Sequence, residues 1–219
     1  NTIESSYKSS ISNVWKDRLA KHQEYTAKIP FSDFKVFDFI CQSLPKNSQL
    51  QVSNSSAIRY LQLFDLDKTV QVFCNRGTSG IDGSTSTAIG AALASDLPTM
   101  LITGDISFLY DSNALWNNYI PKNFKIILLN NSGGGIFRIL PGHQETETFN
   151  TYFETSHQLN ASHLAKMYGF DYFEANEETT LQQQYSAFLN QNEKPSILEI
   201  FTPEKENNGI LLEFFRGLK

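Results

Sequence analysis

Glutamate is absent from a long central part of this 219-residue sequence, since none lies between Tyr25 and Gln144. Cysteine is also scarce, and the two residues present, Cys41 and Cys74, have no CxxC partner. The four histidines lie far apart, so zinc-type ligand spacing is missing and we expect two reduced, buried thiols. The net charge of −5 is mild and acidic, which argues against the basic surface that nucleic-acid binding requires.

Long apolar runs are missing as well. No stretch approaches the roughly 20 residues of a membrane span, and the N-terminus lacks the charged start and apolar core of a signal peptide. We therefore expect a cytoplasmic protein. The sequence does not begin with methionine, which leads us to expect a piece of a longer protein. What is present, 40% hydrophobic and 13% aromatic residues, suffices for a packed core.

The hydrophobic pattern alternates between short apolar runs and helical stretches. Residues 1–30 are a polar lead-in that we expect to be partly helical, and residues 31–219 are the expected folded domain. Such alternation is typical of βαβ units, so we predict a three-layer α/β sandwich around a mainly parallel sheet of about six strands. The predicted strands are 49–54, 70–75, 98–105, 124–131, 170–175 and 196–201, and the predicted helices are 32–45, 55–64, 84–95, 161–168 and 177–190, with one more running through Phe108, Leu109 and Leu115.

One segment, residues 141–157, stands apart because it is long, polar and weakly periodic. Loops of this length inside a compact domain are usually functional or mobile. We expect it to be the most mobile part of the chain until a ligand or a partner orders it.

Besides residues 75–83, two polar motifs lie at the ends of predicted strands, GDIS at 104–107 and NNSGGG at 130–135. Ligands bind at the carboxyl ends of strands in open parallel sheets. Asp105 begins the next helix, whose free N–H groups, together with Ser107, can hold phosphate oxygens. A carboxylate beside a phosphate requires a cation between them, which indicates a divalent metal. Asp105 could instead be a simple helix N-cap.

The second motif offers oxygen ligands of the kind that magnesium accepts, namely the amide oxygen of Asn131 and a bare glycine carbonyl. Asn131 follows Asp105 by 26 positions, enough for one helix and one strand, so both residues return to the same edge of the sheet. The alternative is an ordinary glycine-rich turn in which the asparagine side chains bond locally.

The spacing of GD and NN resembles the fingerprint of thiamine-diphosphate enzymes. Two longer strings, NRGTSGIDGSTSTAIGAA at 75–92 and GDISFLYDSNAL at 104–115, more narrowly resemble the 2-succinyl-5-enolpyruvyl-6-hydroxy-3-cyclohexene-1-carboxylate synthase family of menaquinone biosynthesis. The resemblance runs from about residue 31 to the C-terminus. It implies the cofactors thiamine diphosphate and Mg²⁺, and a transferase that joins 2-oxoglutarate to isochorismate with loss of CO2. It also implies a homodimer or homotetramer.

The resemblance assigns roles to particular residues of this sequence. The metal ligands would be Asp105, Asn131 and the carbonyl of Gly133. Ile81 would hold the two cofactor rings bent, and the residues expected to contact the diphosphate are Gly104, Ile106 and Ser107. Substrate carboxylates would pair with Arg59 and Arg76. Ser55, one helical turn before Arg59, is expected to share its helix face and to assist. The apolar wall of the substrate site would consist of Ile136, Phe137 and Leu140. Without the resemblance, Arg59 could be a surface group and the apolar wall an ordinary amphipathic turn.

Three features depart from the family pattern. Ser132 stands where a third asparagine is expected, and Gly135 stands where a polar residue is expected. The glutamate that activates the cofactor is missing, and the family supplies it from a pyrimidine-binding domain of the partner subunit. We therefore expect the chain alone to be inactive. Two other readings stay open: an acetolactate-synthase-like thiamine-diphosphate decarboxylase, or a non-catalytic binding or assembly domain.

Overall fold

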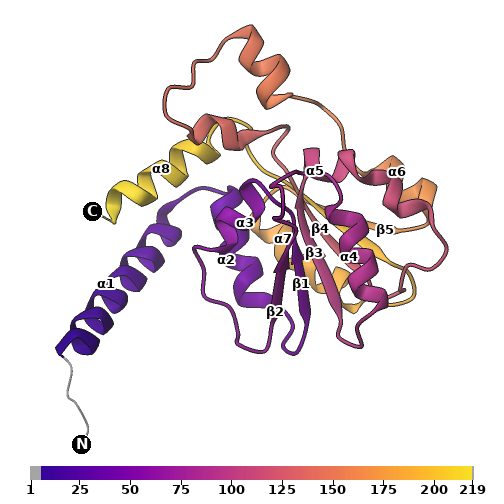
Figure 1. The fold of residues 1–219 in the computed structure, drawn as a ribbon, viewed down its shortest axis with the longest axis horizontal. Helices are drawn as coiled ribbons and strands as arrows, with labels where there is room; N and C mark the ends of the chain where they lie inside the picture. The colour runs from indigo at the N-terminus through magenta and orange to yellow at the C-terminus, as the bar shows by residue number, and fades with distance from the viewer. Residues whose placement is uncertain (1–5, 219) are drawn as a thin grey trace, which may run out of the picture.

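The fold is built on one six-stranded sheet in which all neighbouring strands run parallel (Figure 1). The computed structural model describes residues 6–218. The strand order is β2-β1-β3-β4-β6-β5. The strands are β1 (Gln49–Val52), β2 (Gln71–Cys74), β3 (Thr99–Gly104), β4 (Lys125–Asn130), β5 (Asp171–Ala175) and β6 (Ser196–Phe201).

Helices cover both faces of this sheet, which confirms the predicted three-layer sandwich (Figure 1). In the central strand β4, Ile127 and Leu129 belong to one buried cluster and Ile126 and Leu128 to the other, because side chains alternate between the faces of a strand. The first cluster packs against α2 (Asp33–Ser43), α3 (Ser56–Leu61), α7 (Glu178–Asn190) and α8 (Asn207–Gly217), and the second against α4 (Ser84–Leu93), α5 (Asp105–Tyr110), the 3-10 helix η1 (Ser112–Trp116) and α6 (Ser162–Tyr168).

The helix predicted through Leu115 is wrong in its extent, because α5 ends at Tyr110 and η1 follows it. Asp111 separates the two, and its carboxylate accepts hydrogen bonds from the backbone N–H of Ser86, at 2.7 Å, and from the Ser86 hydroxyl. These bonds supply an acceptor to the first turn of α4, whose N-cap residue Gly83 has no side chain to do so. A tertiary contact therefore ends the helix earlier than its periodicity suggests.

The lead-in is more regular than expected, because α1 (Ser6–Lys28) is one continuous helix that projects from the body (Figure 1). Its C-terminal end is attached to α8 by a 2.5 Å hydrogen bond from the Tyr25 hydroxyl to the carbonyl of Ile210. The helix α8 itself was not among the predicted elements. The domain boundary near residue 31 stays a prediction.

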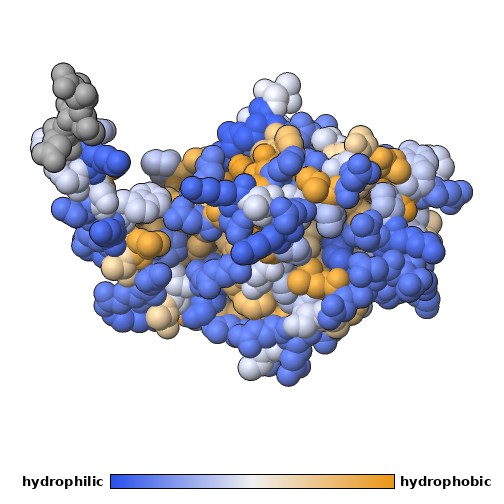
Figure 2. All heavy atoms as spheres, turned by 90° about the horizontal axis from the view of Figure 1, so that it is seen from below, coloured by the Kyte–Doolittle hydropathy of each residue, from blue (hydrophilic) through white to orange (hydrophobic). Residues whose placement is uncertain are grey.

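Polar side chains dominate the face seen in Figure 2, with small apolar patches between them. Within residues 6–218, no helix combines the length and the apolar character that a membrane crossing needs. Of the two cysteines, Cys41 is buried as predicted, whereas Cys74 is only half-buried because it ends the edge strand β2.

Candidate functional site

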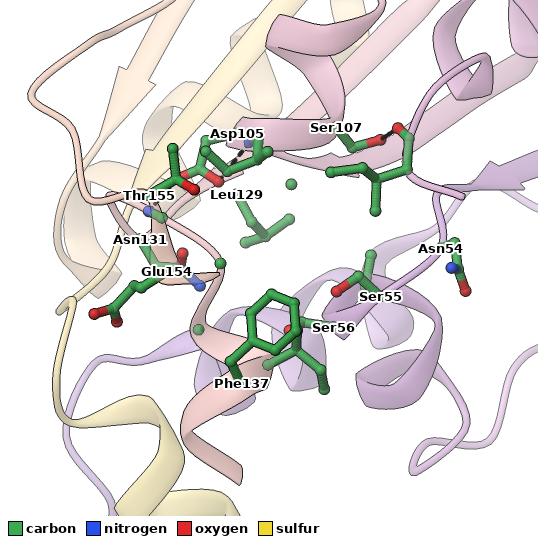
Figure 3. Close-up of a pocket in the computed structure, with 18 of the residues that line it drawn as sticks. Asn54, Ser55, Ser56, Asp105, Ser107, Leu129, Asn131, Phe137, Glu154 and Thr155 are labelled. Carbon is green, nitrogen blue, oxygen red and sulfur yellow. Dashed lines mark hydrogen bonds between the residues drawn. The ribbon is translucent and has the colours of Figure 1, made fainter. Parts of the chain in front are cut away.

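A cavity of about 370 Å³ lies where the chain leaves two adjacent strands in different directions. β1 and β3 are hydrogen-bonded neighbours, yet β1 is followed by α3, which packs on one face, and β3 by α5, which packs on the other. Such a switch point leaves a crevice at the carboxyl ends of the strands. The residues that follow both strands, 54–57 and 104–107, line it, as Figure 3 shows for several of them.

Asp105 is the buried carboxylate of this cavity, with 4% of its surface exposed. Its Oδ1 accepts a 2.7 Å bond from the N–H of Ile106, and its Oδ2 accepts a 3.0 Å bond from the N–H of Gly133. The second bond joins the two motifs recognised in the sequence. His157 Nε2 lies 3.4 Å from the same Oδ2, and this contact raises the pKa of His157 while burial acts in the other direction.

Asn131 lies beside Asp105 at the start of the glycine loop and lines the same cavity (Figure 3). Its Nδ2 donates a 2.9 Å hydrogen bond to Asp33, a buried residue at the start of α2. None of residues 6–218 donates a hydrogen bond to its Oδ1, which therefore keeps its lone pairs for a ligand. The neighbouring Asn130 has a structural role, since its Nδ2 donates to Glu199 at 2.7 Å and to the carbonyl of Leu159 at 2.9 Å.

The glycine loop lies against the end of the segment 141–157. The N–H of Gly134 donates a 2.6 Å bond to the carbonyl of Glu154, and the N–H of His157 donates to the carbonyl of Ser132 at 3.1 Å. Gly133 has a φ of +154°, and a Cβ placed there would lie 2.8 Å from the carbonyl oxygen of Glu154. Glycine is thus required here by a close backbone approach that the sequence did not show.

Gly104 does not need glycine's conformational freedom, although it ends strand β3 at the edge of the cavity. Its φ of −85° and ψ of 163° are ordinary extended values, and a Cβ added there would meet nothing within 4 Å. Because Gly104 lines the cavity, its missing side chain instead leaves room for a ligand. Ser107 donates a 2.5 Å bond from its hydroxyl to the carbonyl of Ile81, which ties the loop after β2 to the start of α5.

The predicted substrate residues are only partly brought together. Ser55 lines the cavity and has a φ of +74°, a value that non-glycine residues rarely adopt. It precedes α3 instead of sharing a helix face with Arg59, whose Nη1 donates a 2.7 Å bond to the Ser55 carbonyl. Arg59, Arg76 and Leu140 are exposed and do not line the cavity.

The apolar wall of the cavity is formed in part by Ile136 and Phe137, on the 3-10 helix η2 (Gly135–Ile139). The predicted loop 141–157 contains a short helical element, η3 (Phe149–Glu154), and Phe153 of this element packs edge-on against Phe137 with ring centroids 5.8 Å apart. The sequence analysis did not predict that residues of η3 line the cavity, because the polar composition of this segment indicated only a loop. Whether residues 141–157 are the most mobile stretch stays a prediction.

Glu154 was not among the site residues predicted from the sequence. The structure corrects this, because Glu154 lines the cavity with 1% of its side chain exposed. Its two carboxylate oxygens accept hydrogen bonds from Nε and Nη2 of Arg138, itself buried. Figure 3 shows the carboxylate turned away from Ser55 and Ser56 across the cavity. As placed, Glu154 is an ion-pair partner and not a free acid.

The charges and donors around the cavity fit a phosphorylated group held through a divalent cation. Asp105 supplies a buried carboxylate that no lysine or arginine among residues 6–218 neutralises, and Asn131 supplies an uncommitted amide oxygen. His157 is the one ion-pair contact of Asp105 among these residues, and a bound cation would further offset the cost of burying the carboxylate. The carbonyl of Gly133 accepts the N–H of Gly135 at 3.0 Å, which leaves one of its two lone pairs for a third ligand bond.

A parallel α/β sandwich with these groups at its switch point defines a class of domains that hold a phosphorylated cofactor at the carboxyl ends of strands. The family comparison narrows this class. The family model described as thiamine pyrophosphate enzyme, C-terminal TPP binding domain, matches residues 54–200, and the chain belongs to this family. The thiamine-diphosphate cofactor expected from the sequence is thereby confirmed at the level of the family.

Two curated relatives carry the name 2-succinyl-5-enolpyruvyl-6-hydroxy-3-cyclohexene-1-carboxylate synthase. The chain is 63% identical to the protein of Flavobacterium johnsoniae over 216 residues, which cover 99% of this chain and 39% of that protein. It is 64% identical to the protein of Flavobacterium psychrophilum over 218 residues, covering 100% of this chain and 40% of that protein. These similarities confirm the narrower resemblance. The chain spans about two fifths of the length of these relatives.

Among solved structures, the chain is similar to benzoylformate decarboxylase from Polynucleobacter necessarius, with a TM-score of 0.65 and 18% sequence identity. The match covers 82% of this chain and 34% of that one. At so low an identity, the likeness supports the fold alone.

Proposed function

We propose that this chain is the diphosphate-binding part of a thiamine-diphosphate-dependent carboligase. The reaction proposed for the whole protein joins 2-oxoglutarate to isochorismate with loss of CO2 in menaquinone biosynthesis. The observation that carries the proposal is the pairing of Asp105 and Asn131 at the switch-point cavity, in a chain 63% identical to a synthase of that name. The expected cytoplasmic location belongs to the same proposal.

The proposal gives each part of the cavity a task. Asp105, Asn131 and the carbonyl of Gly133 would hold Mg²⁺, and the backbone of residues 104–107 would contact the diphosphate. When bound, thiamine diphosphate supplies the electron sink that decarboxylation of a 2-oxo acid needs. Ile81 lines the cavity and would hold the two cofactor rings bent, and its backbone carbonyl accepts a 2.5 Å hydrogen bond from the Ser107 hydroxyl.

Substrate binding is assigned to lining residues of the cavity and to two exposed arginines outside it. Ser55, Ile136 and Phe137 line it, and they would orient the substrates and exclude water. Both substrates carry several carboxylates, which planar guanidinium groups bind well. Arg59 and Arg76 are exposed, so substrate or a partner chain would have to bring them into the site.

The activating glutamate is proposed to come from a pyrimidine-binding domain of the partner subunit, within a homodimer or homotetramer. Support comes from the chain itself: among residues 6–218, Glu154 is the one glutamate that lines the cavity, and it is engaged by Arg138. General acid–base groups must be within hydrogen-bond reach of the atom they serve. A paired, buried carboxylate that faces away from the cavity centre does not meet this requirement.

The metal assignment is tested by titrating the whole protein with thiamine diphosphate in the presence of Mg²⁺, using calorimetry. Asp105→Ala should abolish magnesium-dependent binding and leave the circular-dichroism spectrum unchanged. Asp82→Ala is the matched control, because Asp82 is an exposed carboxylate in a neighbouring loop outside the cavity lining. Normal cofactor affinity in Asp105→Ala would refute the assignment.

The substrate assignment is tested by turnover. Arg59→Ala and Arg76→Ala should each lower kcat/KM by the equivalent of about 1.5–3 kcal/mol while cofactor affinity stays unchanged. An acetolactate-synthase-like enzyme is the rival function, and it would turn over pyruvate in preference to 2-oxoglutarate. Comparing the two 2-oxo acids with the whole protein decides between these functions.

A non-catalytic binding or assembly domain is the second rival for the chain on its own. We expect the 219-residue chain to fold but not to catalyse. Turnover by the isolated chain at rates near those of the whole protein would contradict this. Glu154→Gln would then show whether Glu154 had supplied the missing acid. Calorimetry on the isolated chain with cofactor and Mg²⁺ separates a competent binding site from an inert scaffold.

A further inference from the structure

Asp33 is a buried carboxylate at the cavity whose role nothing in the metal and substrate assignments explains. It begins α2, is 3% exposed and lines the cavity together with Asn131. None of residues 6–218 forms an ion pair with it. Instead, its Oδ1 accepts a 2.6 Å hydrogen bond from the Thr202 hydroxyl, and its Oδ2 accepts the 2.9 Å bond from Nδ2 of Asn131. A buried acid held only by neutral donors is costly, so its retention calls for a reason.

The contact between Asp33 and Asn131 determines which end of the amide faces the cavity. An ionised carboxylate accepts hydrogen bonds and does not donate them, whereas the two ends of an asparagine amide differ: the NH2 end donates and the oxygen end accepts. Asp33 can therefore bond only the NH2 end of Asn131. The oxygen end is left pointing away from Asp33, and it is this end that can bind a cation. A rotated amide would present two N–H groups to the cation instead.

We propose that Asp33 is a positioning residue that orients the amide of Asn131 so that Oδ1 serves as a ligand of the cation. This rests on the proposed function, in which Asn131 binds Mg²⁺. Neighbours that orient metal ligands in this way are known to affect affinity strongly, with typical losses of 10–100-fold on mutation.

The position of Asp33 is fixed by elements far from the glycine loop. Its backbone N–H donates a 2.8 Å bond to Oδ1 of Asn207, at the start of α8, and Thr202 follows β6. The N–H of Thr202 in turn donates to the carbonyl of Asn130 at 3.0 Å, which closes the network next to Asn131. Contacts with Asn207 and Thr202 therefore fix Asp33 independently of Asn131. Its carboxylate can for that reason determine the orientation of the Asn131 side chain.

A double-mutant cycle on the whole protein tests this, with the Mg²⁺ dissociation constant measured at saturating thiamine diphosphate by calorimetry. Asp33→Ala should weaken Mg²⁺ binding by about tenfold or more. In an Asn131→Ala background, Asp33→Ala should have no further effect, since the amide that it orients is gone. A purely structural role for Asp33 would instead give the same loss in both backgrounds, and that result would overturn the inference.

A second pair of variants avoids any loss of packing, because Asp33→Asn has the same shape. The new amide can present its oxygen to Asn131, so Asp33→Asn should keep the Mg²⁺ affinity within about threefold of the native value. In an Asn131→Asp background, by contrast, Asp33→Asn should change the Mg²⁺ affinity by more than threefold, because it replaces two repelling carboxylates by one carboxylate that accepts a hydrogen bond from the new amide. Equal effects in both backgrounds would refute the orienting role. If Asn131→Ala itself leaves Mg²⁺ affinity unchanged, the metal assignment fails, and not merely the part given to Asp33.

Discussion

Replacing Glu154 by leucine should release the segment 141–157 from the glycine loop. Glu154 is almost fully buried, and its carboxylate makes a two-pronged contact with the guanidinium of Arg138. Leucine is an apolar side chain of similar size, so the packing is largely kept. Arg138, however, stays buried without its main partner. The same residue's carbonyl holds the N–H of Gly134 at 2.6 Å, so the effect should reach the cofactor loop.

The free-energy cost of this substitution depends on the contacts that Arg138 retains. Removing one member of a buried ion pair typically costs about 3–5 kcal/mol. Arg138 retains Glu145, whose carboxylate is 3.5 Å away and half exposed, and the ring of Phe149 at 5.5 Å. An exposed ion pair contributes about 0–1 kcal/mol, so we expect a cost near the lower end, about 3 kcal/mol. The variant can also avoid this cost by opening residues 141–157 locally, because opening exposes the Arg138 guanidinium to water. The cost in the folded state therefore cannot exceed the free energy of that local opening.

Hydrogen exchange is the suitable assay, since it resolves local opening from global unfolding. In Glu154→Leu, amides of residues 141–157 should exchange at least about 100-fold faster, which corresponds to roughly 3 kcal/mol. The midpoint of urea unfolding should move much less. The double variant with Arg138→Met should recover most of the protection, because apolar pairs often replace buried ion pairs at little cost. Lys28→Ala, which breaks the exposed pair with Glu24, serves as the control.

Unchanged exchange in Glu154→Leu would refute this reasoning. It would mean that the segment is already open most of the time in the free protein. That outcome would agree with the mobility predicted for residues 141–157 from their polar sequence. It would also mean that the ion pair between Arg138 and Glu154 does not hold this segment against the glycine loop.

Three further predictions concern other parts of the chain. Gly133→Ala should weaken cofactor binding in calorimetry, because Gly133 has a φ of +154° and the new Cβ would lie 2.8 Å from a carbonyl oxygen. Gly90→Ala is the control: it has open space around it in α4 and should raise the unfolding free energy by about 1 kcal/mol. Burial raises the pKa of the Cys41 thiol to about 12, so iodoacetamide at pH 8 should modify Cys74 first and Cys41 only on unfolding, as read by peptide mass spectrometry. Burial lowers the pKa of Lys125 from 10.5 to about 8, so the unfolded chain binds more protons between these values and stability should rise there with pH. The difference in unfolding free energy between Lys125→Met and the native protein should therefore change between pH 7 and 9.5, and a constant difference would contradict the shift.

The sequence by itself determined the layers of the fold and the motifs at its functional edge. Runs such as 125–130 are buried on both faces, so their apolar composition alone indicates a central parallel strand. Asp105 and Asn131 each follow a strand, and parallel strands end at one edge, so their proximity followed from spacing. Both features depend on residues that are close together in the sequence, so they can be predicted without knowing how distant segments pack.

The tertiary structure alone decided the contacts between distant segments. Asp33 meets Asn131 across 98 positions of sequence, and neither residue carries a pattern that points to the other. Glu154 reaches the cavity because a polar segment folds back over the glycine loop, where the close backbone approach also explains Gly133. The family resemblance assigned Arg59 to a substrate carboxylate, yet in the structure its guanidinium donates a hydrogen bond to the carbonyl of Ser55. Side-chain direction and long-range pairing depend on the packing of the whole chain, and for that reason periodicity and spacing do not reveal them.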